Sequence, residues 1–243
     1  MGFPTRERAL RKRLDGRADV HIHTRYSDGR ASVREVLDRA FTDPRLDVIA
    51  ITDHNTIEGA LEAARLAPEY PLEVVVGEEI TSLEGHILGL FLKEAVPPGL
   101  SAGETIAAVH AQGGLAIAAH PFAPRHDHVR GVGRVPMGLG RALRQVPFDG
   151  VEVVNSFPLF APANWLARRA QRASGAAATG GSDAHVVQAV GKGYTSFPGR
   201  TAADLALAIR QRRTAAGGSF YGPRLVLAYA MFVADIYRGR TAG

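Results

Sequence analysis

The stretch DVHIHTRYSDG, residues 19–29, begins as a buried strand and then places polar side chains where the strand ends. His21 and His23 are two residues apart, so both side chains point to the same face of an extended strand. Asp28 follows in a turn marked by Ser27 and Gly29. Because two imidazoles on one face can bind the same cation, the stretch predicts a metal site at the end of a buried strand.

Short apolar runs of the same kind recur along the chain. The predicted strands cover residues 19–23, 47–52, 73–79, 86–92, 115–120, 151–155 and 176–180. Most are continuous rather than alternating, which is typical of a parallel sheet buried on both faces. Helix-like runs lie between most of them, although the short link from Glu79 to His86 favours a hairpin or a tight turn. This order predicts an α/β fold, a barrel of about seven strands.

Helix starts and one long loop complete this outline. The candidate N-caps are Ser32, Thr56, Ser101 and Thr201. The first and third have a glutamate three residues later, which is the capping-box pattern. Residues 121–136 are rich in Gly, Pro and Arg and lack periodicity, so we expect a functional or disordered loop there.

The composition suits a single domain over residues 1–243, with motifs from about 18 to 200 and a helical extension over about 201–243. The chain is 46% hydrophobic and has no cysteine, so disulfides and thiolate metal sites are excluded. The net charge of +5 is mostly dispersed arginine. Dispersed basic residues favour anionic small substrates over a nucleic-acid wrapper, which usually shows a clustered stripe.

The long apolar run LVLAYAMFVADI, residues 225–236, is well short of the roughly 20 residues that a membrane span needs. We expect a packed helix. An interfacial membrane helix is the alternative, because Arg224, Arg238 and Arg240 flank the run. The N-terminus is charged and has no apolar segment behind it, so we expect a cytoplasmic protein without stable membrane insertion.

Ligand-type residues also follow or open the other predicted strands. They are Asp53, His54, Glu78, Glu79, His86, His120, Asp183 and His185. The carboxyl ends of barrel strands meet at one mouth, so these residues are expected to converge. Buried ionisable groups need compensation, and a shared metal is the simplest form of it. His110 in a helical run and His126 and His128 in the loop are expected to lie outside this site.

These motifs resemble those of the PHP (polymerase and histidinol phosphatase) family. The matching pieces are DVHIHTRYSDG, ITDHNT, GEEIT, GHILGL, AHP and GSDAH, in the family's order, over residues 18–186. The resemblance implies a distorted (β/α)7 TIM-like barrel. The TDHNT piece is more similar to the small metal-dependent phosphoesterase branch than to the histidinol phosphatase branch.

The resemblance also implies up to three divalent transition metals, which Mn, Fe or Zn can supply. The ligands of the first are His21, His23, Glu79 and Asp183. The ligands of the second are Glu79 as a bridge, His86 and His120. The ligands of the third are Asp28, His54 and His185. Glu79 rather than Glu78 matches the family's pattern, and Asp19 and Asp53 are expected to orient histidines from behind.

Such a centre predicts a phosphatase-type hydrolase that cleaves a phosphate ester by metal-bound hydroxide. We expect a small phosphorylated metabolite as substrate, with a nucleotide favoured. The candidate substrate-binding residues are Arg25, Arg125, Arg130, Arg134 and Asn155. Asp28 and Arg125 are the candidate catalytic residues, with Asp28 or a loop histidine as the proton donor.

Two other functions remain open. A 5′-3′ exonuclease on short 5′-phosphorylated oligonucleotides is compatible with the same centre, but the loops offer few aromatic residues for base stacking, chiefly Tyr26 and Phe122. A non-catalytic, metal-stabilised binding module is the second alternative. The complete ligand set argues against it, and the sequence leaves the exact substrate and the oligomeric state open.

Overall fold

The computed structural model describes residues 14–42, 46–130, 132–157, 160–219 and 222–237. Its main sheet contains nine strands. They are β1 Gly16–Asp19, β2 Val48–Ile51, β3 Glu73–Thr81, β4 His86–Leu90, β5 Leu115–Ala118, β8 Gly150–Asn155, β9 Ala177–Gly181, β10 Gly193–Phe197 and β11 Ala215–Gly218. Their spatial order is β11-β10-β1-β2-β3-β4-β5-β8-β9. β1, β2 and β3 pair in parallel, and so do β5, β8 and β9. β4 runs antiparallel to β3 and β5, and β10 runs antiparallel to β1 and β11.

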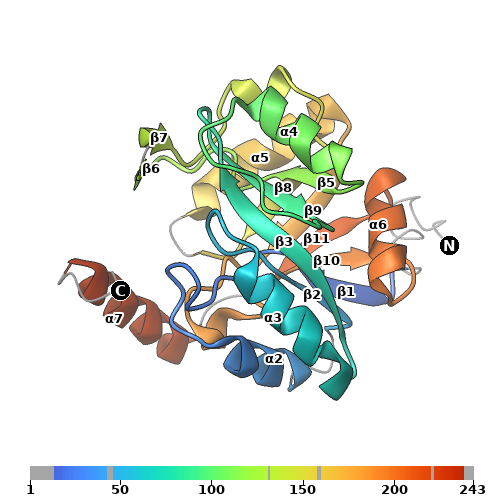
Figure 1. The fold of residues 1–243 in the computed structure, drawn as a ribbon, viewed down its shortest axis with the longest axis vertical. Helices are drawn as coiled ribbons and strands as arrows, with labels where there is room; N and C mark the ends of the chain where they lie inside the picture. Colours follow the sequence, from blue (N-terminus) through green and yellow to red (C-terminus); the bar gives the residue numbers. More distant parts are fainter. Residues whose placement is uncertain (1–13, 43–45, 131, 158–159, 220–221, 238–243) are drawn as a thin grey trace, which may run out of the picture.

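The two ends of this sheet curl toward each other and nearly close it into a barrel (Figure 1). The Thr195 hydroxyl on β10 donates to the Gly180 carbonyl on β9 and accepts from the Gly180 amide. Beyond β1, Ile22 forms an isolated bridge with Ala184, which follows β9. The expected α/β, distorted TIM-like barrel is therefore confirmed.

The strand count and several strand boundaries differ from the prediction, and the first strand differs most. β10 and β11 were not predicted: AAGG has little β-propensity, and GYTSF has the alternation of a half-buried strand instead of the continuous apolar character of the predicted strands. The first strand ends at Asp19 instead of spanning residues 19–23. Beyond this point the Asp19 carboxylate accepts hydrogen bonds from the Ser182 and Gly191 amides. A side chain thus replaces part of the backbone hydrogen bonding between strands.

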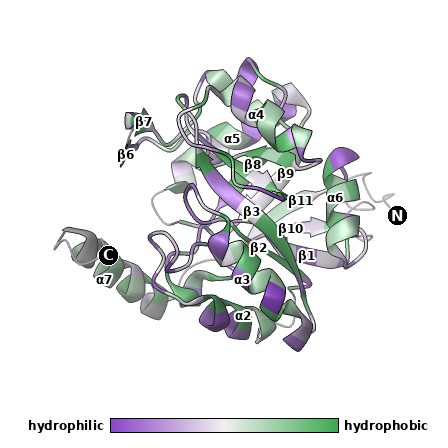
Figure 2. Ribbon diagram, in the orientation of Figure 1, coloured by the Kyte–Doolittle hydropathy of each residue, from purple (hydrophilic) through white to green (hydrophobic). Residues whose placement is uncertain are grey.

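Within the described residues six α-helices flank the sheet, with hydrophilic and hydrophobic stretches alternating along α2 and α3 (Figure 2). They are α2 Val33–Phe41, α3 Glu58–Leu66, α4 Ala102–Ala111, α5 Ala161–Ser174, α6 Ala202–Arg210 and α7 Pro223–Tyr237, with 3₁₀ turns η1 Ala67–Glu69, η2 Ala142–Arg144 and η4 Val187–Ala189. The Ser32 and Ser101 capping boxes are confirmed, and Thr201 caps α6. The prediction for Thr56 was wrong by one residue: Ile57 is the N-cap, and Thr56 accepts the Glu58 amide from outside the helix.

Two segments stand out on one side of the molecule (Figure 1). The expected loop at 121–136 contains an antiparallel hairpin, β6 His126–Val129 and β7 Gly133–Pro136. The apolar run 225–236 lies in α7, a packed helix with buried Leu225, Tyr229 and Phe232. No helix within the described residues has the length and apolar character to cross a membrane. The residues Arg238 and Arg240, and the side chain of Arg224, fall outside the described part.

Candidate metal centre

Glu79 is the centre of a buried cluster formed where the strands end. One carboxylate oxygen, Oε2, lies 3.1 Å from Nε2 of both His21 and His23. The other, Oε1, lies 2.9 Å from Nδ1 of His86 and from Nε2 of His120. These four histidines come from three segments far apart in sequence, so the fold brings them together as expected.

The ligand-type residues form three overlapping groups, within each of which the candidate ligand atoms lie within 4.8 Å of one another. The inner group is His21, His23, Glu79 and Asp183, all buried. The rim group is His23, Asp28, His54 and His185. The bridging group is His54, Glu79 and His86. With His120 beside Glu79, all nine predicted ligands therefore lie in one cluster.

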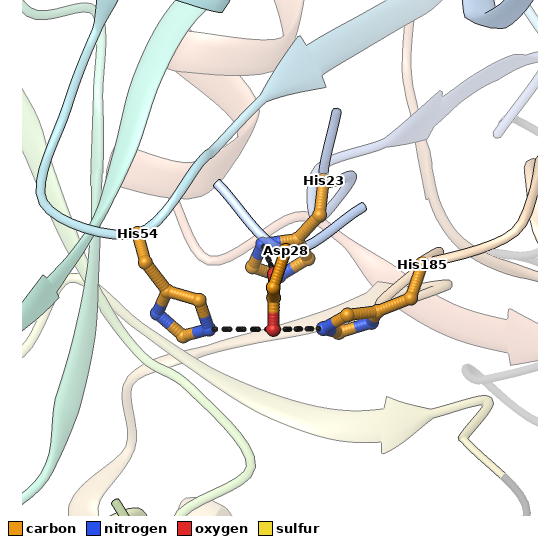
Figure 3. Close-up of side chains that lie close together, drawn as sticks. All are labelled: His23, Asp28, His54 and His185. Carbon is orange, nitrogen blue, oxygen red and sulfur yellow. Dashed lines mark hydrogen bonds and ion pairs between the residues drawn. The ribbon is translucent and has the colours of Figure 1, made fainter. Parts of the chain in front are cut away.

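Asp28 lies at the middle of the rim group (Figure 3). Its carboxylate lies 3.1 Å from Nε2 of His185, 3.5 Å from Nδ1 of His23 and 3.8 Å from Nε2 of His54. The Asp28 side chain is 42% exposed, whereas that of Glu79 is buried. The rim group therefore faces the solvent side of the cluster.

His23 provides the clearest test of whether these residues fit a cation. It is buried, and neither of its ring nitrogens makes a hydrogen bond within the described residues. Yet Nε2 lies 3.1 Å from Glu79 Oε2 and 3.2 Å from Asp183 Oδ1. Buried polar atoms are normally hydrogen-bonded. Carboxylate and imidazole atoms that converge without hydrogen-bond geometry are the donor set and arrangement that a divalent transition metal takes.

The electrostatics of the cluster agree with this fit. Burial alone would raise the pKa of Glu79, but His54, His21 and His86 hold it well below its usual range. Burial alone would lower the pKa of His23, but Asp183, Glu79 and Asp28 raise it to about 10. Without a metal, His23 therefore holds a proton that offsets the charge of the nearby acids, and a bound cation would replace that proton.

Local backbone geometry aims the ligands. Asp183 has a left-handed φ of 51° and His120 a φ of 22°, which are costly values for residues with a side chain. The Asp183 carbonyl accepts the Tyr229 hydroxyl at 3.1 Å. At Gly29 an added Cβ would lie 2.6 Å from the backbone of His23, so this turn needs a glycine to bring Asp28 beside the histidine.

Glu152 on β8 belongs to the centre but was not predicted. Its Oε1 lies 3.0 Å from Nδ1 of His21, on the side of the ring opposite Glu79. Its Oε2 accepts the His120 amide and the Asn155 side-chain amide. A carboxylate behind a ligating histidine fixes the ring and raises its basicity. The sequence signal was a lone acid inside the apolar strand VEVV.

Asp127 was also missed. It lies on β6, and its Oδ2 is 3.2 Å from Nε2 of His86, on the opposite side of that ring from Glu79. Burial would raise the pKa of Asp127, but His86 outweighs it and lowers the pKa. The hairpin therefore contacts the centre through an acid, while its flanking His126 and His128 are exposed, as expected.

Neither Asp19 nor Asp53, the two acids expected to orient histidines, hydrogen-bonds to a histidine ring in the described structure. Asp19 instead accepts the backbone amides of His21, Ser182 and Gly191, which ties the segment after β1 to those after β9 and before β10. Asp53 accepts the amide and the hydroxyl of Thr24 and the hydroxyl of Ser27. Asp53 thus holds the turn that carries Asp28. As expected, His110 lies away from the cluster and pairs with Asp149.

A pocket of about 250 Å³ opens onto the cluster. Arg125 lines it and immediately precedes β6 of the hairpin. Arg130 and Arg134 are exposed and are not among its described lining residues. Arg25 is directed elsewhere, with its guanidinium 3.3 Å from Glu35. The structure thus brings one of the four candidate arginines to the pocket.

Asn155 lies behind the ligands rather than in the pocket lining. It is buried, and its side-chain amide donates to Glu152 and to Asp183 Oδ2 at 3.1 Å. Its side-chain oxygen accepts the Phe157 amide. These bonds make Asn155 a support for two acids of the cluster, and leave the expected contact with substrate without geometric support.

Comparisons with known proteins agree with this geometry. The pattern of the PHP domain matches residues 19–117, and that of the PHP-associated region matches residues 161–214. The uncharacterized protein MJ1587 of Methanocaldococcus jannaschii is 41% identical over 152 residues, which are 58% of this chain and 82% of that protein.

Two named enzymes match shorter segments. The 5′-3′ exoribonuclease of Haemophilus influenzae is 40% identical over 83 residues, 32% of this chain and 30% of its own. The 3′,5′-nucleoside bisphosphate phosphatase of Chromobacterium violaceum is 39% identical over 90 residues, 35% of this chain and 30% of its own. This chain therefore covers less than a third of the length of either enzyme.

Solved structures share the fold. A two-domain Bacteroides vulgatus protein, described as containing a predicted PHP-like metal-dependent phosphoesterase, matches with a TM-score of 0.66 at 19% identity over 83% of this chain and 64% of its own. PsfC from Pseudomonas syringae matches with a TM-score of 0.65 at 20% identity over 91% and 98% of the two chains. Eight of the nine expected ligands, all except His120, fall inside the two matched PHP segments, and this chain belongs to the PHP family.

Proposed function

We propose that the protein is a metal-dependent phosphoesterase that hydrolyses a phosphate ester of a small metabolite, with a nucleotide as the favoured substrate. The observation that carries this proposal is the buried ligand cluster around Glu79, which opens into a pocket lined by Arg125. Family membership supports the metal-dependent phosphoesterase activity. The nucleoside bisphosphate phosphatase and exoribonuclease among the relatives support the choice of a nucleotide.

The proposed metal ligands are those expected from the sequence. They are His21, His23, Asp28, His54, Glu79, His86, His120, Asp183 and His185. When bound, divalent cations such as Mn, Fe or Zn lower the pKa of a ligated water and offset the charge of a phosphoryl group. The inner, bridging and rim groups give room for up to three ions.

Arg125 and Asp28 face the pocket and have different proposed roles. The planar guanidinium of Arg125 binds two phosphoryl oxygens and orients the ester. Burial would raise the pKa of Asp28, but His185 and His54 lower it, so this carboxylate stays ionised. An ionised carboxylate suits a ligand, and the protonated form needed of a general acid is disfavoured.

The exonuclease alternative is less well supported by the pocket. About 250 Å³ is small beside the roughly 300–1,000 Å³ of typical ligand pockets. The lining comes from α7 and from the segment that leads into the hairpin, as well as from the strand ends. This enclosure fits a single nucleotide better than a strand. Comparing a mononucleotide with 5′-phosphorylated oligonucleotides of increasing length separates the two functions.

The direct test is metal analysis of the purified protein, followed by a phosphate-ester panel after reconstitution with Mn, Fe or Zn. We expect bound transition metal and phosphate release that a chelator abolishes. Metal binding without turnover of any ester would favour the non-catalytic binding module. The absence of both would overturn the proposal.

A further inference from the structure

Helix α7 forms part of the wall of the metal-centre pocket, although it lies outside both matched PHP segments. Its inner face buries Leu225, Tyr229 and Phe232, and Phe232 lines the pocket. Its outer face is exposed, with Leu227 62% accessible. The helix therefore presents two different faces, and the inner one borders the place where substrate is proposed to bind.

Specific contacts fix α7 against the ligand-bearing segments. The Tyr229 hydroxyl donates to the carbonyl of Asp183 at 3.1 Å. Arg30 donates its side chain to the Met231 carbonyl at 3.2 Å and its backbone amide to the His185 carbonyl at 2.9 Å. The Arg30 guanidinium also lies over the Phe232 ring, 5.6 Å from its centroid. These contacts hold Phe232 in a defined place beside the rim group.

The pocket has two chemically different walls. One consists of the ligand-type residues with Arg125 and Asp127, and the other of Met137, Phe157, Phe160 and Phe232. The apolar wall is a connected cluster, since the Phe157 ring lies 5.1 Å from those of both Phe160 and Tyr229. The Phe232 ring lies 5.1 Å from the His185 ring at an angle of 48°. The apolar wall thus begins directly beside a proposed metal ligand.

An ester bound with its phosphoryl group at the ligands and Arg125 would have its leaving group beside this second wall, which adjoins His185. The described side chains of that wall offer three phenyl rings and a thioether. Hydroxyl groups of a polyol would lose their water there without gaining strong hydrogen bonds from these side chains. A flat aromatic group gains contact with the rings instead.

We propose that α7 and the Phe157–Phe160 segment form a leaving-group subsite for planar aromatic groups, such as a nucleobase or an aryl ring, and that Phe232 determines this specificity. The proposal rests on the proposed phosphoesterase function and narrows its substrate class. It also assigns a role to the apolar C-terminal run, which the sequence alone did not explain.

The test compares benzyl phosphate with glycerol 3-phosphate, two esters of primary alcohols that differ in the leaving group's aromatic character. Wild-type protein is expected to hydrolyse the benzyl ester with a kcat/KM about 10-fold higher or more, as aromatic stacking allows. Phe232→Ala is expected to lower kcat/KM for the benzyl ester about 10-fold while leaving the glycerol ester within about 2-fold. Leu227→Ala, on the exposed face of the same helix, is the matched control and should change neither.

Binding and metal measurements keep the outcomes distinct. Affinity for benzylphosphonate, which is not hydrolysed, should fall in Phe232→Ala while metal content stays at the wild-type level. Phe232→Leu, which keeps an apolar side chain, is the variant to use if the alanine variant does not fold, and it should lose benzyl preference without losing metal. Equal rates for the two esters in the wild type, or an equal loss for both in the variant, would overturn the subsite. No turnover of any ester by metal-loaded protein would instead overturn the phosphoesterase function, and benzylphosphonate binding would still decide the subsite.

Discussion

The inner and rim groups of the metal centre share His23 but are built differently. The inner group is buried, and Glu152 and Asn155 support its ligands from behind. In the rim group Asp28 comes from a turn, and its side chain is 42% exposed. A desolvated ligand set supported from behind holds an ion more firmly than one with a solvent-exposed member. We therefore expect a tightly held inner ion and a rim ion that exchanges more readily.

The two groups also differ in their position relative to the pocket. Asp28, His54 and His185 of the rim group line it, and so do Glu79 and Asp183 of the inner group, whereas His21 and His23 do not belong to its described lining. The proposed ions of both groups would therefore have ligands at the pocket, and the exposed side chain of Asp28 puts the rim group nearer to solvent. We therefore expect the inner group to hold the more firmly bound ion and the rim group to bind the ion that is more accessible to substrate.

The largest effect is expected from Glu79→Gln, because Glu79 belongs to both the inner and the bridging groups. Loss of the bridging charge should remove metal from both and lower kcat by about 10³-fold or more, since a metal supplies several kcal/mol of charge stabilisation. Metal content per chain and phosphate release measure the two effects. Retention of full metal content would contradict the central position of Glu79.

The comparison of groups is tested by a pair of variants, His23→Ala and Asp28→Ala. His23 directs Nε2 toward Glu79 and Nδ1 toward Asp28, so its loss should weaken both ions. Asp28→Ala should weaken the rim ion alone. We expect activity to fall about 100-fold in both, with different metal contents. Titration with a chelator while metal release is followed reports each ion, and identical release curves for the two variants would contradict the division.

His23 and Asp28 show how much of the candidate site could be predicted from the sequence. Alternating residues on a strand and the convergence of strand ends in a barrel are local and topological rules, which predicted that ligand-type side chains converge. The resemblance to the PHP family selected nine of these side chains, and the structure brings all nine into one cluster. The local and topological rules have limits. They assigned His21 and His23 to a single ion. The structure shows that the two rings differ, since His21 is directed toward Glu79 and Glu152 while His23 lies between two groups. Ring orientation depends on packing, which spacing does not encode.

The residues that sequence reasoning missed act through contacts between distant segments. Glu152 meets His21 across 131 positions, and Tyr229 meets the Asp183 carbonyl across 46. No periodicity links such pairs. The hairpin β6–β7 was not predicted, because its Gly- and Arg-rich sequence has little β-propensity. The fold class, in contrast, follows from the order of apolar runs and helix caps.

Glu152→Leu tests whether the carboxylate behind His21 increases the affinity of the inner group for its ion. Loss of this carboxylate should lower the affinity for the inner ion by about 10- to 100-fold, the usual range for a group that orients a ligand. Glu152→Gln keeps an acceptor for the His120 amide and should lose less. Calorimetric titration of metal-free protein measures both variants.

Glu78 supplies the matched control for that experiment. It is a buried acid one residue from Glu79, and its Oε2 accepts the Val96 amide. Burial raises its pKa to about 7, so Glu78→Gln changes the charge of this residue only in part near neutral pH. Metal affinity should stay at the wild-type level. A loss in Glu78→Gln equal to that in Glu152→Gln would show that any buried acid matters, and would remove the special role of Glu152.

The smallest expected effect concerns two arginines near the pocket, Arg125 and Arg134. They differ in position, but both are charged and exposed. Arg125 lines the pocket, and Arg134 lies on β7 outside its described lining. Arg125→Ala should lower kcat/KM about 10-fold, since a hydrogen bond to a charged group contributes roughly 1.5–3 kcal/mol and exposure reduces this. Arg134→Ala should stay within about 2-fold, because a distant exposed charge is largely screened by salt. Metal content should be unchanged in both. An equal, salt-sensitive loss in the two variants would mean that the basic rim attracts the anion as a whole and that Arg125 does not bind the phosphoryl group directly.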